Sequence, residues 1–445
     1  MISTNPTDLL RSSLLTALLA LAAAGCSNGA TTGPDASQPG GADATASASD
    51  ATATVSDAAV VSKPDASTAT VDASASATAS DAEVVDSADA STASPDAGQA
   101  AEPRLVAMSR EGKVASLQVV EPFTVKATGD LGAAVGSAKC LGSRCVAVHP
   151  TPDDKLTVFD ARTLEVTAEI ALESGADPRD VTLVDDHTAV VSQFERAALL
   201  EVDLVTKAKT PIDLAVLADS DGQPEADRLT SCGRRVFVQL RRDDHANPGI
   251  PSALPAVLAV VDLDKSGAER VVDADPATQG VQGIVLAVRP KFDMPVDCAA
   301  GMLYVSEPRP LMQGGSGYEK VDLKTLKAAD YDIDTGAEGG GFEVLTETNY
   351  WIITHTEFGP GPSSHLNCVG GTRDETWNTF ASEHVDDLAL DRVGDLLFYP
   401  DPCSTISNNA SCENGIHVFH AHSGELATTP VVSLGFAPIE VALAR

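Results

Sequence analysis

The chain has 445 residues, of which 64 are acidic and 30 are basic, so its formal net charge at pH 7 is −34. A protein of this charge repels nucleic acids and anionic lipid surfaces, and we therefore expect no nucleic-acid partner. The same field suits cations, basic partners or simple solubility.

The first 25 residues have the pattern of an export signal. A polar stretch with Arg11 precedes a run of about 13 apolar or small residues, which is the length of a signal-peptide core and too short to span a bilayer. Residues 21–26, Leu-Ala-Ala-Ala-Gly-Cys, resemble the lipobox of bacterial lipoproteins, although Ala23 stands where leucine is commonest. The resemblance implies lipid attachment at Cys26, a membrane partner through that anchor and, with Ser27 next, sorting to the outer membrane. The alternative is a plain secretory signal followed by an incidental cysteine.

Residues 26–103 form a spacer of unusual composition. After Cys26 it contains no Phe, Trp, Tyr, Leu, Ile or Met, and it carries 12 acidic residues against one base, Lys63. Such a segment has almost nothing to bury and cannot offset the entropy of ordering. We expect it to stay unfolded as a tether. A linker whose sequence drifts freely and a functional stalk would both behave in this way.

Residues 104–445 are globular in composition and read as short strands separated by turn residues. An alternating apolar strand followed by a turn recurs, and the turn position falls at Asp160, Asp203, Asp262, Asp322 and His420. Intervals of about 40–60 residues built from four strands are typical of a β-propeller. We predict an all-β fold of seven blades, with six or eight as alternatives.

A second repeated string, an acidic residue before an apolar strand, marks the innermost strand of each unit. Its last copy, residues 438–443, leaves no room for the other strands of its blade. Three strands are available at the start of the domain, at 105–109, 113–120 and 123–128. We therefore predict that a mixed blade closes the ring.

Residues 156–191 look like the YVTN-type repeat of bacterial surface propellers. They contain a strand, the Asp160-x-x-Thr163 turn, a second strand ending near Gly175, then Pro178 and the inner strand. The resemblance covers about one and a half repeats, and Asp185-Asp186-His187 replaces the usual Pro-Asp-Gly turn. It implies the propeller fold and, because the family has no single activity, little about function.

Seven cysteines follow Cys26, and export would place them in an oxidising compartment where pairing is expected. Cys140 and Cys145 flank a tight turn, Cys403 and Cys412 bracket a loop, and Cys232 and Cys298 fall on or after neighbouring inner strands. We predict these three pairs. Cys368 is left over, and we expect it to be buried and inert rather than a metal ligand or an intermolecular link.

The acids of the inner strands are the main candidate site. All inner strands of a propeller begin at one face, so we expect these acids to ring the mouth of the central channel, interrupted by Lys139; they are Asp180, Asp227, Asp297, Glu343, Asp387 and Glu440. Six neighbouring carboxylates cannot all stay ionised without compensation. A bound cation is one solution, with Ca²⁺ the natural choice for oxygen ligands. The other is that each acid caps backbone amides or pairs with a basic neighbour.

Two smaller groups are weaker candidates for metal binding. Asp219, Asp221 and Glu225 resemble part of a calcium loop, but the glycine is misplaced. His420 and His422 occupy a turn, where solvated histidines are the simpler interpretation.

The long connections lie on the same face as the acids, at 215–224, 241–255, 275–294, 308–317, 358–364 and 400–415. Long loops on a rigid scaffold carry variable function. No catalytic motif accompanies them, so the sequence favours a non-enzymatic module that binds a protein, glycan or small molecule. The alternatives are a calcium-dependent hydrolase or lactonase, with carboxylates at the channel mouth, and a structural role in an envelope complex.

Overall fold

The computed structural model describes residues 102–243, 254–287, 289–307, 316–333, 338–346, 349–356, 363–370, 373–380, 385, 387–402 and 413–445. The predicted signal peptide, Cys26 and the spacer up to residue 101 lie outside these residues, as do Cys403 and Cys412. No helix in the described part of the chain is long and apolar enough to cross a membrane.

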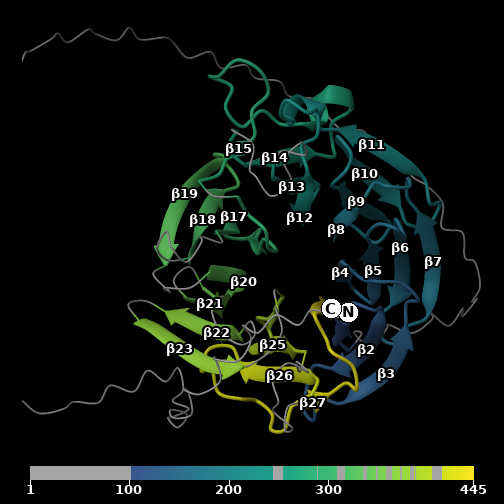
Figure 1. Cartoon of the computed structure of the whole chain (residues 1–445), viewed down its shortest axis with the longest axis vertical. Helices are drawn as coiled ribbons and strands as arrows, with labels where there is room; N and C mark the ends of the chain where they lie inside the picture. Colours follow the sequence, from purple (N-terminus) through teal and green to yellow (C-terminus); the bar gives the residue numbers. More distant parts are fainter. Residues whose placement is uncertain are drawn as a thin grey trace, which may run out of the picture. The chain divides into compact units, whose positions relative to one another are not determined.

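The described residues form seven four-stranded antiparallel sheets arranged as the blades of a propeller (Figure 1). The prediction of seven blades is confirmed. From the centre outward, blades 1 to 4 consist of β28(Glu440–Ala444)-β1(Arg104–Met108)-β2(Lys113–Gln118)-β3(Val125–Asp130), β4(Ser137–Leu141)-β5(Arg144–His149)-β6(Lys155–Asp160)-β7(Val166–Ala171), β8(Pro178–Leu183)-β9(Thr188–Gln193)-β10(Ala198–Asp203)-β11(Lys209–Asp213) and β12(Ala226–Cys232)-β13(Arg235–Leu240)-β14(Val257–Asp262)-β15(Ile284–Val285). Blades 5 to 7 are β16(Val296–Asp297)-β17(Met302–Glu307)-β18(Ser316–Asp322)-β19(Lys327–Ile333), β20(Glu338–Val344)-β21(Asn349–Thr356)-β22(Ser363–Gly370)-β23(Arg373–Phe380) and β24(Ala389–Asp391)-β25(Leu396–Asp401)-β26(Gly415–His420)-β27(Val432–Ser433). Two short 3-10 helices, η1(Ala215–Leu217) and η2(Gly267–Arg270), lie in connections.

The ring is closed by blade 1, as predicted. Strand β28 pairs with β1 from Arg104↔Ala444 to Met108↔Glu440, so the two ends of the domain share one sheet. We call the face where the inner strands begin the top face and the face where they end the bottom face. Because β1 starts opposite the end of β28, the chain enters the domain at the bottom face.

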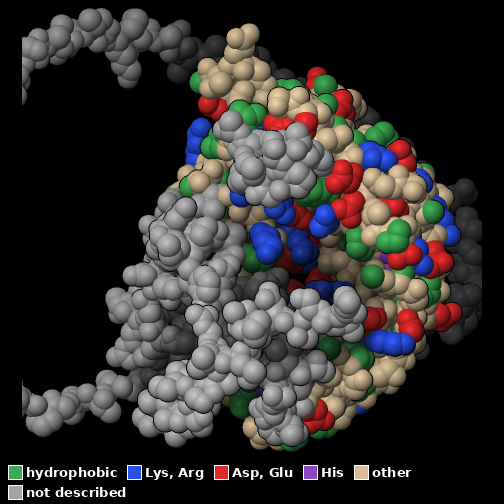
Figure 2. All heavy atoms as spheres, viewed as in Figure 1, with side chains coloured by type: hydrophobic (Ala, Val, Ile, Leu, Met, Phe, Trp, Pro, Cys, Tyr) green, Lys and Arg blue, Asp and Glu red, His purple; other side chains and the backbone are tan. Residues whose placement is uncertain are grey.

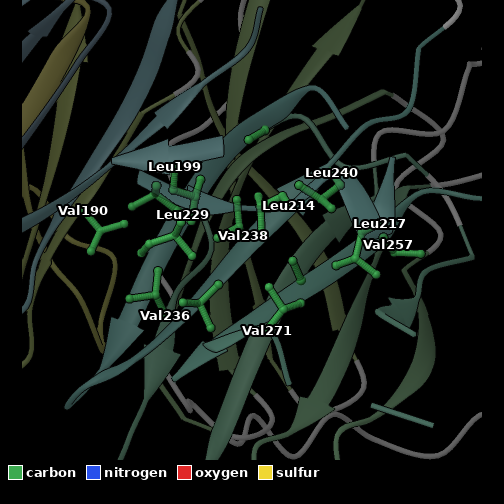
Figure 3. Close-up of a cluster of buried hydrophobic side chains, with 14 of the residues drawn as sticks. Val190, Leu199, Leu214, Leu217, Leu229, Val236, Val238, Leu240, Val257 and Val271 are labelled. Carbon is green, nitrogen blue, oxygen red and sulfur yellow. The ribbon is translucent and has the colours of Figure 1, made fainter. Parts of the chain in front are cut away.

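Apolar side chains between neighbouring blades form the core. Strand β14 reads Val-Leu-Ala-Val-Val-Asp and its first five residues are buried, because both faces of a blade are covered. One cluster joins Val190 and Leu199 of blade 3 to Leu229, Val236 and Val238 of blade 4 (Figure 3). Burying each such side chain stabilises the fold by about 1.5–3 kcal/mol.

The recurrent aspartate forms the turn between the third and fourth strands of a blade. The Asp160 carboxylate accepts hydrogen bonds from the backbone N–H groups of Arg162 and Thr163, both at 2.9 Å. Leu164 follows with a φ of 61°, in the left-handed region that completes the turn. Asp203 and Asp322 accept equivalent pairs of N–H groups in blades 3 and 5.

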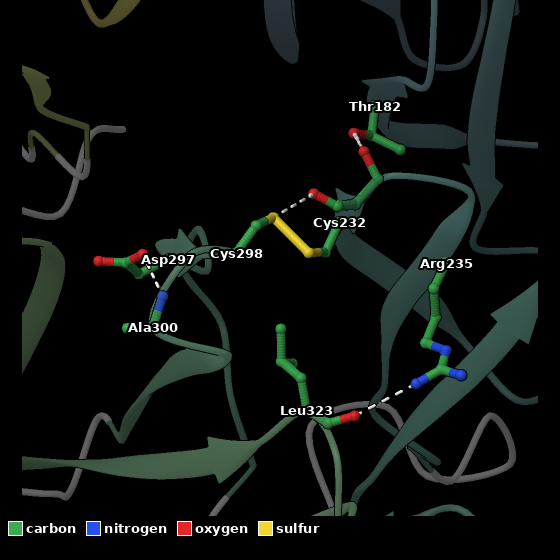
Figure 4. Close-up of a disulfide and its surroundings, with 8 residues drawn as sticks. Thr182, Cys232, Arg235, Asp297, Cys298, Ala300 and Leu323 are labelled. Atoms are coloured by element: carbon green, nitrogen blue, oxygen red, sulfur yellow. Dashed lines mark hydrogen bonds between the residues drawn. A yellow bond between two sulfur atoms is a disulfide. The ribbon is translucent and has the colours of Figure 1, made fainter.

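Two of the three expected disulfides lie within the described residues. Cys140 pairs with Cys145 across the β4–β5 turn, with Cα atoms 4.1 Å apart. Cys232 at the end of β12 pairs with Cys298 after β16 and so links blades 4 and 5 (Figure 4). Disulfides are typical of oxidising, extracytoplasmic compartments.

Candidate functional site

The inner strands do not align as their acidic residues suggest, because three of them contain a bulge. The pairing shifts between Pro178 and Val181 in β8, between Ala226 and Leu229 in β12, and between Gly339 and Phe342 in β20. When the bulges are superimposed, Asp180 corresponds to Arg228 and to Gly341. Glu343 therefore stands two residues further along its strand than Asp180 does.

Blade 5 differs in the same way. Val296 pairs with Leu303, and the backbone N–H of Tyr304 donates to the carbonyl oxygen of Pro295. Extending this pairing backwards places Asp293, rather than Asp297, at the level of Arg228 and Asp180. One layer across the channel, which we call the ring layer, is thus made of Ser137, Asp180, Arg228, Asp293, Gly341, Asp387 and Glu440.

The structure brings three of the six predicted acids, Asp180, Asp387 and Glu440, into the ring layer. Asp227 is displaced by the β12 bulge and its carboxylate lies 3.5 Å from Arg241. Asp297 lies beyond the layer and pairs with Arg392 at 3.1 Å. Both residues therefore lie outside the expected ring. The β12 bulge shifts the register of Asp227, and the short strand β16, of two residues, shifts that of Asp297.

The three acids of the ring layer each hold the next blade. Asp180 Oδ2 accepts the Leu229 N–H at 2.9 Å, and Asp387 Oδ2 accepts the Val441 N–H at 2.6 Å. Glu440 Oε1 accepts the Ala138 N–H at 3.1 Å across the closing blades. These N–H groups belong to inner strands that have no strand partner on the channel side, so the carboxylates satisfy buried donors.

The remaining charges of the ring layer meet at Asp293. Its carboxylate forms ion pairs with Lys139 and, at 3.3 Å, with Arg228. Burial raises the pKa of the Asp293 carboxyl, but the two cations outweigh it and leave the pKa below its usual value. Burial alone would lower the pKa of Lys139, yet the surrounding carboxylates raise it above its usual range. The ion pairs therefore stay charged at neutral pH.

The pKa values of Asp180, Asp387 and Glu440 are raised, in contrast to that of Asp293. Burial raises the pKa of Asp387 to about 7, and the nearby Asp293 carboxylate adds to the effect. Burial and the neighbouring Asp387 raise the pKa of Glu440 well above its usual value, and burial raises that of Asp180. The ring layer thus holds more carboxyl groups than Arg228 and the adjacent Lys139 can balance.

Below the ring layer lies a cavity of about 470 Å³. Two residues further along each strand stand Lys139, Thr182, Thr230, Pro295, Glu343, Ala389 and Ala442, and all of these except Thr182 line it. Apolar walls come from Phe342, Leu388, Leu390 and Leu443, and the far end carries Arg392, Val393 and Arg445. Figure 2 shows the hollow at the centre of the ring, with Lys and Arg side chains gathered around it.

Glu343 is the acid of this second layer. Among the described residues its carboxyl has neither a hydrogen-bond nor an ion-pair partner, although it lines the cavity. Burial raises its pKa to about 8, and the more distant Arg392 and Lys139 oppose this only in part. A carboxyl group that is predominantly protonated at neutral pH therefore faces the cavity.

The other sequence candidates do not form metal sites in the described part of the chain. No three His, Cys, Asp or Glu side chains there are arranged to hold a metal ion. Burial raises the pKa of Glu225 to about 8, with Asp221 and Asp219 adding to it. His422 Nδ1 lies 2.5 Å from Asp395 Oδ1, in a turn of blade 7. Much of the predicted loop face, including 244–253, 308–315 and 403–412, lies outside the described residues.

Sequence reasoning missed Asp293 and Arg228, which form the central ion pairs with Lys139. Asp293 sits in a connection with no strand signal before it, and Arg228 follows the acid that was chosen in its place. The signal that could have identified Arg228 was its position directly after an acidic residue in an inner strand.

Comparisons with known proteins show the fold alone. No family model and no curated protein matches the chain. The structure resembles a putative 6-phosphogluconolactonase from Bacteroides uniformis, with 13% identity, a TM-score of 0.52 and coverage of 78% of this chain and 100% of that one. A second putative 6-phosphogluconolactonase, from Bacteroides fragilis, has 11% identity, a TM-score of 0.52 and coverage of 79% and 100%.

Proposed function

We propose that the chain is an exported, lipid-tethered binding protein that takes a small molecule into the central cavity of its propeller. The cavity of about 470 Å³ carries this proposal. Ligand pockets of about 300–1,000 Å³, walled by apolar groups with a few polar ones, bind small molecules. The apolar walls and the unpartnered Glu343 carboxyl fit that description.

The placement of the acids supports binding rather than metal-assisted hydrolysis. Three carboxylates that would be calcium ligands accept backbone N–H groups instead, and a fourth, Asp293, is held by two cations. The two Bacteroides proteins carry a lactonase name, so lactone hydrolysis remains the alternative for this chain. That alternative predicts turnover of a lactone panel that requires Ca²⁺ and stops in EDTA.

The test is binding of a small-molecule panel of amines, alcohols, carboxylates and sugars to the purified full chain, followed by thermal unfolding. A ligand that binds only the folded protein stabilises it by about 2.7 kcal/mol at a hundred times its dissociation constant. Thr230 is half-buried and lines the cavity. Thr230→Phe should put an aromatic ring into the cavity and reduce the shift for ligands that reach it, whereas the near-isosteric Thr230→Val should keep the shift. A panel in which Thr230→Phe blocks no ligand contradicts the proposal.

A further inference from the structure

Glu343 differs from every other acid near the channel axis. Asp180, Asp387 and Glu440 hold neighbouring blades, and Asp293 holds Lys139 and Arg228. In the described residues of the second layer, the positions equivalent to Glu343 are occupied by Lys139 and by small or uncharged residues. Among the described residues, the Glu343 carboxyl forms no hydrogen bond or ion pair with a neighbouring blade, so it does not hold the blades together.

The cations around the channel are engaged with acids other than Glu343. Lys139 and Arg228 pair with Asp293, and Arg445 at the far end of the cavity pairs with Asp391. Arg392, also in the cavity wall, donates to Asp297 at 3.1 Å and to the Val344 carbonyl at 2.7 Å. Among the described residues, none of these cations forms an ion pair with Glu343, although Arg392 and Lys139 lower its pKa from a distance.

The walls around Glu343 suit an organic cation better than a metal ion. A hard metal ion needs several oxygen ligands at once, and the described residues offer no group of three that could hold one. Leu390 and Leu443, which are only partly buried, instead present apolar surface in the same cavity. A molecule with an apolar body and one charged nitrogen satisfies both features.

We propose that Glu343 is the recognition group for a primary ammonium, and that the ligands of this protein are small amines whose apolar part packs against Leu390 and Leu443. This inference rests on the proposed function. The ammonium donates a hydrogen bond to the Glu343 carboxylate and is the ion-pair partner that no described residue supplies. Because a simple alkylamine has a pKa near that of lysine, about 10.4, the proton stays on the nitrogen in the pair.

The test compares three probes of the same shape, 2-phenylethylamine, 2-phenylethanol and phenylacetate, by calorimetric titration of the full chain at pH 8. A charged hydrogen bond is worth roughly ten- to hundredfold in affinity, so we expect the amine to bind that much more tightly than the alcohol, with phenylacetate weakest. Glu343→Gln should remove the amine preference and leave alcohol binding unchanged. Glu173→Gln, at an exposed site, is the matched control and should change neither.

The pH profile gives a second readout. The charged groups near Glu343 are Arg392, Lys139 and Asp293, and Asp387, whose pKa is about 7, lines the same cavity. The Glu343 carboxyl has a pKa of about 8, and the loss of the pH dependence in Glu343→Gln assigns it to this group rather than to Asp387. Amine affinity should fall about tenfold per pH unit below 8, since binding must displace the Glu343 proton, while alcohol affinity stays flat.

Three outcomes overturn the inference: equal affinity for amine and alcohol, a preference for phenylacetate, or an amine preference that survives in Glu343→Gln. Binding of other compounds that Thr230→Phe blocks would then leave the cavity proposal standing without the amine. If the broad panel also fails, the proposed function itself is wrong.

Discussion

Replacing Asp180 by alanine tests whether the ring layer holds the blades together. The Asp180 carboxylate is fully buried and accepts the Ser137 Oγ–H at 2.5 Å and the Leu229 N–H at 2.9 Å, which belong to the two adjoining blades. A buried donor that loses its acceptor costs about 1–3 kcal/mol, so Asp180→Ala should cost about 2–6 kcal/mol of unfolding free energy. Removing one of several crowded carboxyl groups also relieves repulsion among the others, which offsets part of the lost unfolding free energy. We therefore expect a value in the lower half of the range.

Asp180→Asn separates the hydrogen bonds from the charge. The amide oxygen can still accept the Leu229 N–H, and the amide nitrogen can donate to Ser137, so the variant should lose less than about 1.5 kcal/mol. Asp186→Ala, at an exposed position, is the control and should stay within about 0.5 kcal/mol of the parent. Urea unfolding followed by circular dichroism measures all three. The reasoning is refuted if alanine and asparagine cost the same, or if alanine costs less than about 1 kcal/mol.

Three further predictions concern pH, disulfides and turns. Folding raises the pKa of Glu343 to about 8 and of Asp387 to about 7, so these groups stabilise the fold below pH 4 and lose that contribution as pH rises through the folded values. The urea midpoint should therefore fall between about pH 5 and 8 and then level, and Glu343→Gln should flatten the slope; a midpoint that rises over this window contradicts it. By loop entropy, losing the Cys232 disulfide, which spans 66 residues, should cost about 4 kcal/mol, against about 2 kcal/mol for that of Cys140, which spans 5. Single Cys→Ala variants in urea measure the order, and the reverse order would refute the entropic account. Asp160→Ala should cost about 1 kcal/mol, because two N–H groups lose their acceptor on a solvent-accessible turn where water replaces it in part; no change would show that the turn forms without it.

The blades were predictable because their turns have a local chemical cause. An aspartate that accepts two following N–H groups recurs at the same position in blades 2, 3 and 5, and its spacing gives the repeat. The closing blade followed from a copy of the inner strand that lacked partners. Both inferences use features that lie within a few residues along the chain.

The ring layer was predictable only in part, because register depends on pairing between strands. The bulges in β8, β12 and β20 each insert a residue, and nothing in the local sequence indicates where. Asp227 and Glu343 therefore lie outside the ring layer, although their positions in the repeated string suggested that they belong to it. Asp293 precedes a strand of only two residues and offers no alternation to recognise. The cavity itself is lined by six segments distant in sequence, and its volume depends on side chains from all of them.

The position of β1 has a mechanical consequence. Any pull on the chain before Arg104 reaches the domain through β1, which is paired along five residues with β28 on one side and along five with β2 on the other. Because the pull enters at one end of a strand held on both sides, it loads these two ladders in shear, with all the hydrogen bonds sharing the force at once. An edge strand would instead peel open one bond at a time. If the predicted tether exists, its attachment point is one where a blade resists extraction.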